Sequence, residues 1–260
     1  MTASLFELPS HARSRVAGAL ESGLLTIPCS LVSLRSVLGS AEGGEKIAEA
    51  LAEFERLGVS SRAAAAWMRS IDAAAARMPR PDLVWSGPSV PGIPARDTRR
   101  VYEELLGSAQ RTIWATSFAY FDGPRVFEIL ARRMESIPAL QVTLLLNIQC
   151  RKGDTSTADA LVGRFADQFW GTDWPGSSRP EVFFDPRSLE LDAPGGVLHA
   201  KAVVADDEAV FVTSANLTEA ALDRNIEIGL LVRDHALALS VTSHFRGLIE
   251  RGRLSPLPMA

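Results

Sequence analysis

Apolar side chains recur every three or four residues through the first part of the chain, which is the spacing of one face of an α-helix. The segments SLVSLRSVLG, GEKIAEALAEFERLG and SSRAAAAWMRSIDAAAARM show this spacing most clearly. Ser10 is expected to cap a first helix, and Ser60 with Ser61 begins the helix that ends before the prolines of MPRPD. Residues 1–80 are therefore predicted to form a small all-helical N-terminal domain.

From residue 81 the pattern changes to short runs rich in β-branched and aromatic residues, which alternate with amphipathic segments. These runs are LVWSG, TIWATSFAY, QVTLLLNI, EVFFD, VLHAKAVVA, AVFVTSA and NIEIGLLV, and a closing helix is expected around HALALSVTSHFRGLIERG. Such an alternation is typical of an α/β fold. Residues 81–260 are predicted to form a mixed sheet with helices on both faces.

Composition and charge narrow the classes of function. Hydrophobic residues make up 47% of the 260 residues, enough for a core, and no run is long enough to span a bilayer. A net charge of −4 argues against a protein that coats nucleic acid with a broad basic face. The first residues lack a secretion signal, and the two cysteines, Cys29 and Cys150, suit a reducing compartment. We therefore expect a cytoplasmic protein without a membrane anchor.

Ionisable residues interrupt the apolar run VLHAKAVVA. His199 and Lys201 are two residues apart, so on a strand they would face the same side of the sheet. A charged pair in an otherwise buried strand needs a partner or a function. Asp206 ends this strand at an acidic turn, and Ser214 and Asn216 follow the next apolar run, AVFVTSA. We expect a hairpin, with Asp206 in a structural role at its turn.

The spacing HxK, four residues, Asp, six residues and then a Gly-Ser-x-Asn slot resembles the HKD motif of the phospholipase D superfamily. Thr213 stands where that family often has glycine, and its β-branched side chain is expected to narrow the phosphate pocket. Glu227, in DRNIEIGLLV, resembles the acidic residue of a further family strand. The resemblance implies an α/β, phospholipase D-like fold and a phosphodiesterase that needs neither a metal nor another cofactor.

The roles that this resemblance implies follow the chemistry of phosphodiester cleavage. His199 would attack phosphorus and hold the phosphoryl group as a phosphohistidine. Lys201, the Asn216 amide and the Ser214 hydroxyl would stabilise the charge on the phosphate oxygens. Glu227 would accept the other imidazole N–H and so orient the ring.

In the phospholipase D superfamily a second HKD histidine protonates the departing alcohol, and this chain carries one such motif. The remaining histidines, His11, His235 and His244, have no lysine two residues later. The resemblance therefore implies a homodimer in which two copies of His199 share one cleft.

Three further cations are candidates for contacts with a phosphodiester backbone. Arg151 and Lys152 follow the predicted strand QVTLLLNI, and ligand clefts of α/β sheets lie beyond the carboxyl ends of strands. A solvated loop is the preferred interpretation of these two residues, with Asp154 or Thr155 as the cap of the next helix. Arg224, before the last predicted strand, is a similar candidate.

The order of a helical leader, LVWSGP, RDT before a helix, one HKD motif and NIEIGLLVRD is most similar to the phospholipase D-like component of DISARM antiphage defence systems. This resemblance implies a nuclease acting on DNA, with other DISARM components as partners. Two alternatives stay open: a catalytically weak scaffold that binds nucleic acid or phosphate, and a phospholipid hydrolase. No basic interfacial helix supports the latter. The N-terminal helices are expected to dock a protein or to brace the dimer.

Overall fold

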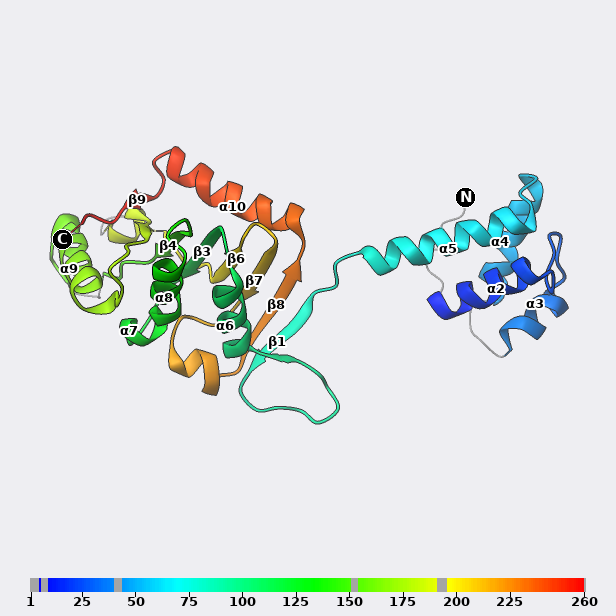
Figure 1. Ribbon diagram of the computed structural model, residues 1–260, viewed down its shortest axis with the longest axis horizontal. Coiled ribbons are helices and arrows are strands. Elements are labelled where there is room, and N and C mark those ends of the chain that lie inside the picture. The colour runs from blue at the N-terminus through cyan, green and yellow to red at the C-terminus, as the bar shows by residue number, and fades with distance from the viewer. Residues whose placement is uncertain (1–4, 6–8, 40–43, 151–153, 191–195, 260) are drawn as a thin grey trace. The chain divides into compact units, whose positions relative to one another are not determined.

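The structure is a computed structural model that describes residues 5, 9–39, 44–150, 154–190 and 196–259. The chain divides into two compact units, Met1–Met78 and Pro79–Ala260 (Figure 1). Among the helices described, none is long and apolar enough to cross a bilayer.

The first unit is helical and has a core of its own. Its helices are α2 (Ser10–Ser22), α3 (Leu31–Leu38), α4 (Gly44–Arg56) and α5 (Ser61–Arg77). Val16, Leu34, Phe54 and Met68 are among the side chains buried between these helices. Each helix turns one face toward this core, and that face is the apolar stripe seen in the sequence.

The helix starts of this unit test two predicted caps. Ser60 accepts a backbone N–H from the first turn of α5, which confirms that prediction. The prediction for Ser10 is wrong, because Ser10 is the first residue of α2 and the capping position is Pro9. Proline has no side-chain oxygen that accepts a backbone N–H, so this end lacks a side-chain cap.

The second unit is built on a mixed sheet, as predicted. Its described strands are β1 (Asp82–Ser86), β2 (Arg96–Asp97), β3 (Thr112–Ser117), β4 (Gln141–Leu146), β5 (Glu181–Phe184), β6 (Ala202–Ala205), β7 (Ala209–Thr213), β8 (Glu227–Arg233) and β9 (Ser255–Pro256). Their spatial order is β2-β1-β8-β7-β6-β3-β4-β5-β9. Strands β3, β4 and β5 run parallel, whereas β6, β7 and β8 alternate in direction.

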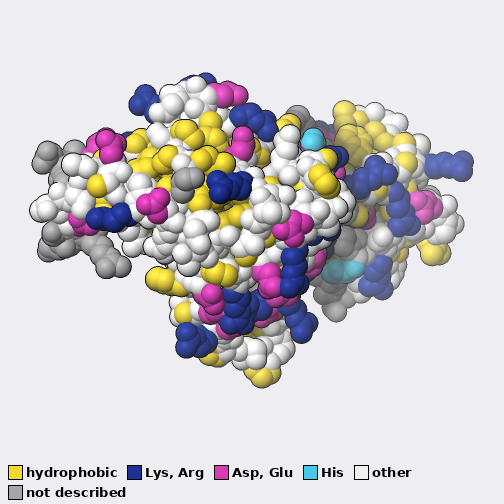
Figure 2. Space-filling view, turned by 60° about the vertical axis from the view of Figure 1, so that its left-hand side comes forward, with side chains coloured by type: hydrophobic (Ala, Val, Ile, Leu, Met, Phe, Trp, Pro, Cys, Tyr) yellow, Lys and Arg dark blue, Asp and Glu magenta, His cyan; other side chains and the backbone are white. Residues whose placement is uncertain are grey.

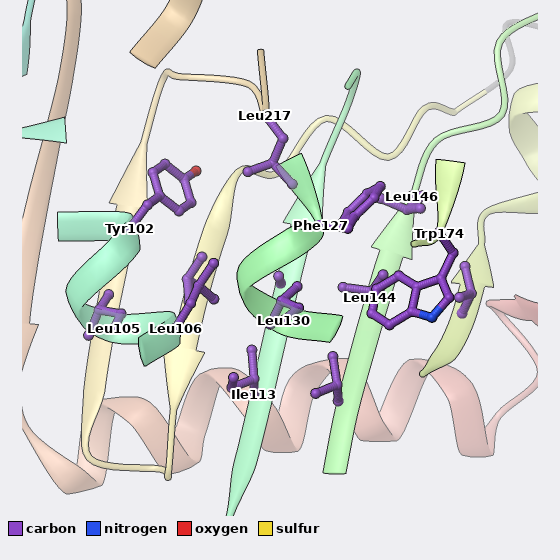
Figure 3. Close-up of a cluster of buried hydrophobic side chains, with 14 of the residues drawn as sticks. Tyr102, Leu105, Leu106, Ile113, Phe127, Leu130, Leu144, Leu146, Trp174 and Leu217 are labelled. Atoms are coloured by element: carbon purple, nitrogen blue, oxygen red, sulfur yellow. The ribbon is translucent and has the colours of Figure 1, made fainter. Parts of the chain in front are cut away.

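Helices cover both faces of this sheet, which confirms the predicted fold class. The helical segments are α6 (Thr98–Ser108), α7 (Gly123–Val126), α8 (Glu128–Ser136), α9 (Ala158–Gln168), α10 (His235–Glu250), the π-helical turns η1 (Phe169–Asp173) and η3 (Ala220–Arg224), and the 3₁₀ turn η2 (Pro186–Leu189). Figure 3 shows α6 and α8 in front of the strands and α10 behind them. The larger core, with Phe127, Leu144 and Trp174, lies on the α6 side. On the other face, Trp114 and Val210 pack against Ala238 of α10.

Helix α9 begins one residue after Thr157, whose hydroxyl accepts a backbone N–H of the first turn at 3.3 Å. The predicted caps, Asp154 and Thr155, are therefore wrong. Asp154 instead pairs with Arg164 of α9 at 3.0 Å, so its carboxylate is already engaged by a guanidinium.

The strand register brings several chain segments to one edge of the sheet. Thr116 of β3 pairs with Ala202 of β6, and Ala202 pairs with Val212 of β7. At the end of the next ladder, Thr213 pairs with Gly229 of β8. The carboxyl ends of β3, β4 and β7 and the amino ends of β6 and β8 therefore lie along the same edge.

The strand predicted over VLHAKAVVA is shorter in the structure. Strand β6 begins after His199 and Lys201, so the prediction that this pair lies within a regular strand is wrong. Around His199 the backbone is hydrogen-bonded instead to side chains at the carboxyl ends of β3 and β4. Asn147 accepts the N–H of the residue before His199 at 3.2 Å, and the Thr116 hydroxyl donates to the carbonyl of the residue after it at 2.9 Å.

The hairpin between β6 and β7 is present as predicted, and Asp206 ties its turn to the start of β3. Asp206 and Asp207 have φ of 55° and 56°, the left-handed pair that a type I′ turn requires. The Asp206 carboxylate accepts the backbone N–H groups of Gln110, Arg111 and Thr112 at 2.7 to 3.2 Å. Burial acts to raise the pKa of Asp206, but these donors outweigh it and the pKa is lowered. Asp206 thus has a structural part in the fold.

We predict that Asp206→Asn lowers the free energy of unfolding at neutral pH by about 2 kcal/mol, because a neutral amide accepts the backbone donors more weakly. Asparagine tolerates the left-handed backbone, so the turn is retained. Because the pKa of Asp206 is lowered by folding, its contribution is present above the ordinary carboxyl pKa and is lost as the pH falls through the folded value. Denaturant unfolding should show the difference between the two proteins shrinking in acid.

Glu208→Gln is the matched control for this prediction, because it removes an exposed ion pair between Glu208 and Arg111 in the same turn. Its effect should stay below about 1 kcal/mol. Equal losses in the two variants, or a loss in Asp206→Asn that does not depend on pH, would contradict the structural role of Asp206.

Gly229 lies where β8 packs closely on β7, and an added Cβ would be 2.6 Å from the ring of Phe211 and 2.8 Å from the Val212 carbonyl oxygen. Gly229→Ala should therefore destabilise the protein by about 1–3 kcal/mol through overpacking. Gly107→Ala in α6 is the control, because nothing lies within 4 Å of its added Cβ, and alanine should stabilise the helix by about 0.5–1 kcal/mol. Thermal melts should shift in opposite directions, and an unchanged melt for Gly229→Ala would refute the close approach.

Candidate functional site

The centre of the candidate site is the pair His199 and Lys201, just before β6. The Lys201 ammonium lies 3.2 Å from Nδ1 and 3.4 Å from Nε2 of His199, and it donates to the His199 carbonyl at 2.8 Å. The imidazole is exposed, whereas Lys201 is 8% exposed. Burial lowers the pKa of Lys201, and the nearby Glu227 carboxylate opposes that lowering. A small anion at the imidazole would therefore meet a partly desolvated cation.

Phe118, directly after β3, packs against both members of this pair. Its ring centroid is 4.8 Å from that of His199 and 5.6 Å from the Lys201 ammonium. An aromatic face attracts a cation, so Phe118 helps to hold Lys201 below the imidazole. Sequence reasoning missed Phe118, and it also missed Asn147, which fixes the backbone beside His199. Their available signal was a position near the carboxyl end of a predicted strand run, TIWATSFAY or QVTLLLNI.

Ser214 and Asn216 follow β7 at the same edge of the sheet. Asn216 Oδ1 accepts the N–H of Ala119 at 3.3 Å, which leaves the amide Nδ2 as the group that can donate to an anion. The Ser214 hydroxyl donates to the Glu227 carboxylate and accepts the N–H of Ile228 at 3.1 Å. The proton of Ser214 is thus directed to a carboxylate of the protein rather than toward a ligand.

Glu227, at the amino end of β8, differs from its predicted contact. Its carboxylate is hydrogen-bonded to the Ser214 hydroxyl and to Asn225 Nδ2, the latter at 3.3 Å, and within the described residues it makes no hydrogen bond to His199. The prediction that it accepts the imidazole N–H is therefore wrong for this structure. The cause is the strand register, because the turn after β7 is bonded to β8 and sets Ser214 opposite Ile228, the neighbour of Glu227.

Thr213 ends β7 and is buried beside this turn. Its hydroxyl donates to the Ile228 carbonyl at 3.3 Å and accepts the N–H of Ala215 at 3.1 Å. These bonds stabilise the turn that carries Ser214. The narrowing of a phosphate pocket by Thr213 stays a prediction.

Of the three further cations, Arg224 lies within the described residues, and no contact described there brings it to His199. Arg151 and Lys152 lie outside the described residues. Arg224 is exposed at the end of η3. The pKa of Asp223 is lowered chiefly by its hydrogen bonds with Arg99, and the charge of Arg224 adds a smaller effect. In the part of the chain that the structure describes, no three His, Cys, Asp or Glu side chains converge as metal ligands.

Comparison with known proteins places this site in a family. A family profile described as "Cardiolipin synthase, PLD-like domain" matches residues 102–249, which lie within the second unit. "DISARM protein DrmC" of Bacillus paralicheniformis is 30% identical over 152 residues, which are 58% of this chain and 56% of that protein. The matched region thus spans about half the length of this curated relative.

Three solved structures are also similar. Nuc, a phospholipase D family member from Salmonella typhimurium, has a TM-score of 0.45 at 18% identity, over 70% of this chain and 100% of its own. NucT from Helicobacter pylori has a TM-score of 0.45 at 17% identity, over 69% and 99%. Phosphatidylserine synthase from Haemophilus influenzae Rd KW20 has a TM-score of 0.45 at 15% identity, over 76% and 47%.

The family profile covers more than half of the chain and includes the site from Phe118 to Glu227. The resemblance predicted from the spacing of the HKD-type residues is therefore confirmed, as is the similarity to a DISARM component. The chain belongs to the phospholipase D-like family described as cardiolipin synthase, PLD-like domain, and it is similar to DISARM protein DrmC.

Proposed function

We propose that this chain is a metal-independent phosphodiesterase, a nuclease acting on DNA, whose site is completed by a second copy of the chain. The observation that carries the proposal is the contact between the exposed imidazole of His199 and the buried ammonium of Lys201. A nucleophile and a fixed cation within reach of the same small anion are what attack on a phosphodiester requires. The Asn216 amide at the same edge supplies a further donor.

In the first proposed step, a ring nitrogen of His199 attacks phosphorus, and a P–N bond forms as the P–O bond to the leaving alcohol breaks. Lys201 and Asn216 Nδ2 stabilise the non-bridging oxygens. The leaving oxygen takes a proton from the partner subunit's His199, which acts as general acid. Water then attacks phosphorus, the same partner imidazole takes the water's proton, and the P–N bond breaks to restore His199.

Two features support a site shared by two subunits. His235, one of the other histidines, contacts the carbonyl of Asp207 at 2.7 Å, in the turn at the opposite end of β6 from the site. It therefore lies away from His199 and is not placed to act as the acid within one chain. Exposed apolar side chains border the site: Val197 precedes His199 by two residues, and Ile226 adjoins Glu227 with 68% of its surface exposed. A second copy seated on this rim would bury apolar surface while supplying the missing acid.

The distribution of charge favours a substrate that the protein contacts at only a few of its phosphate groups. The net charge is −4, and Arg99 is engaged by Asp223 and Glu219, while Arg125 is engaged by Glu219. Figure 2 shows basic and acidic side chains next to one another on the displayed surface. Attraction of DNA then depends on cations in the cleft. The similarity to DrmC supports a role in antiphage defence with other DISARM components. A cytoplasmic location is part of this proposal.

A catalytically weak scaffold that binds phosphate or nucleic acid is the second candidate. The observation that favours it is the hydrogen bond from Ser214 to Glu227, because it withdraws one expected donor from the substrate. Full antiphage protection by a strain carrying His199→Ala would support the scaffold. Release of head groups from phospholipid vesicles would instead support a phospholipid hydrolase, the third candidate.

We predict that His199→Ala lowers cleavage of labelled DNA by at least about a thousandfold, because it removes the nucleophile. The assay contains EDTA, which removes divalent metal ions and so inactivates contaminating metal-dependent nucleases. His244→Ala is the matched control, because His244 is an exposed residue of α10. Equal cleavage by the wild type and His199→Ala would end the enzyme proposal.

Subunit mixing tests the shared site. A hybrid of wild-type and His199→Ala subunits keeps one copy of His199 and should be inactive, so after subunit exchange at equal amounts about a quarter of the dimers should stay active. Exchange with His244→Ala should leave the activity unchanged. If the first mixture instead keeps half of the activity shown by the same total amount of wild type, each subunit works alone.

A further inference from the structure

A cavity of about 500 Å³ opens beside the His199–Lys201 pair, past the carboxyl ends of β3 and β4. The segment after β3 contributes Phe118 and Phe121 to its lining, and the segment after β4 contributes Asn147 and Gln149. Its far wall comes from α9. This volume is in the range of pockets that bind small molecules.

Three contacts join this cavity to the proposed reaction centre. Phe118 is shared, since its ring packs on His199 at a centroid distance of 4.8 Å. Ala119 of the lining donates its N–H to Asn216 at 3.3 Å. Asn147 accepts the N–H of the residue before His199. The group bonded to a phosphate at His199 would therefore lie at the mouth of the cavity.

The lining combines an aromatic surface with amides. Phe121 is 70% exposed, a large apolar ring held at the cavity wall in contact with solvent. Rings of this kind serve as stacking surfaces for nucleobases. Gln149 is also exposed, and its amide carries both donors and an acceptor, as the edge of a base requires.

The charges in the wall fit a neutral ligand group. Arg164 is paired with Asp154 at 3.0 Å, so this cation and this carboxylate are engaged with each other. Among the described lining residues, a second phosphate placed against Arg164 would have to compete with the Asp154 carboxylate. A phospholipid acyl chain would bury the paired charges and the amides without satisfying them, which is unfavourable.

We propose that this cavity binds one unpaired nucleobase next to the scissile phosphate, so that the substrate is single-stranded DNA. The inference rests on the proposed function. A base inside a duplex is stacked and paired, and it would have to be flipped out before it entered the cavity. A single strand presents the base at lower cost, and duplex DNA is therefore a poor substrate.

The test uses single-stranded oligonucleotides with one cleavable phosphodiester among methylphosphonate linkages. One nucleotide next to the cleavable bond, on its 5′ or its 3′ side, is made abasic, and in the control the abasic position is remote. Removal of the base on one of the two sides should lower kcat/KM about tenfold, the usual contribution of one stacked base. The remote abasic position should have no effect, and the matching duplex should be cleaved at least tenfold more slowly than the single strand.

Phe121→Ala and Gln149→Ala assign this effect to the cavity. In Phe121→Ala, the ratio of kcat/KM between the intact and the abasic substrates should fall from about ten to about one. Gln149→Ala should reduce the ratio for some bases and not for others. Leu248→Ala, an exposed apolar position on α10, is the control and should keep the wild-type ratio.

Methyl p-nitrophenyl phosphate, a diester without a base, separates the two levels of the proposal. If wild type hydrolyses neither this diester nor the oligonucleotides, the proposed function fails. If hydrolysis depends on His199 but the abasic and duplex substrates react as fast as the intact single strand, the cavity inference is overturned while the proposed function stands. Phosphatidylglycerol vesicles hydrolysed by wild type and not by Phe121→Ala would overturn it in favour of a lipid.

Discussion

The candidate site depends on the pairing of β6 with β3 in opposite directions. Strands β3 and β4 run parallel, so their carboxyl ends share one edge of the sheet, and an antiparallel β6 begins at that same edge. The residues that precede β6 are thereby delivered to the strand ends that carry Phe118 and Asn147. A parallel β6 would have put His199 at the opposite edge, away from Phe118 and Asn147. The chemistry of the site thus follows from the direction of one strand.

Once delivered, the reactive pair is held by groups that take no part in the proposed reaction. Asn147 and Thr116 bind the backbone on either side of His199, and Phe118 packs against the imidazole and the Lys201 ammonium. Such support has a physical purpose. An imidazole on an unrestrained loop would sample many positions. Only a few of them would place its nitrogen for attack on phosphorus, so the reaction would be slower. Backbone fixed by buried side chains limits that loss.

Sequence reasoning recovered the fold class and the identity of the motif residues because both depend on local spacing. The alternation of apolar runs and helices predicted the mixed sheet, and the intervals between His199, Lys201 and Asp206 pointed to the family. It failed where the deciding contact is distant in the chain. The late start of β6, after Lys201, accompanies bonds across 51 and 84 residues. The partner of Glu227 was missed because it depends on the register of β7 against β8, which a single sequence does not reveal.

The Asp206 turn and the His199 pair lie at the two ends of the same four-residue strand. At roughly 3.3 Å per residue, β6 is a spacer of about 13 Å between a point clamped to the backbone of β3 and the candidate site. Its length also sets orientation, since successive side chains alternate between the faces of the sheet. An added residue would keep every motif side chain and yet turn Lys201 toward α10. The gap between Lys201 and Asp206 therefore fixes the direction of the Lys201 side chain as well as its distance from the turn.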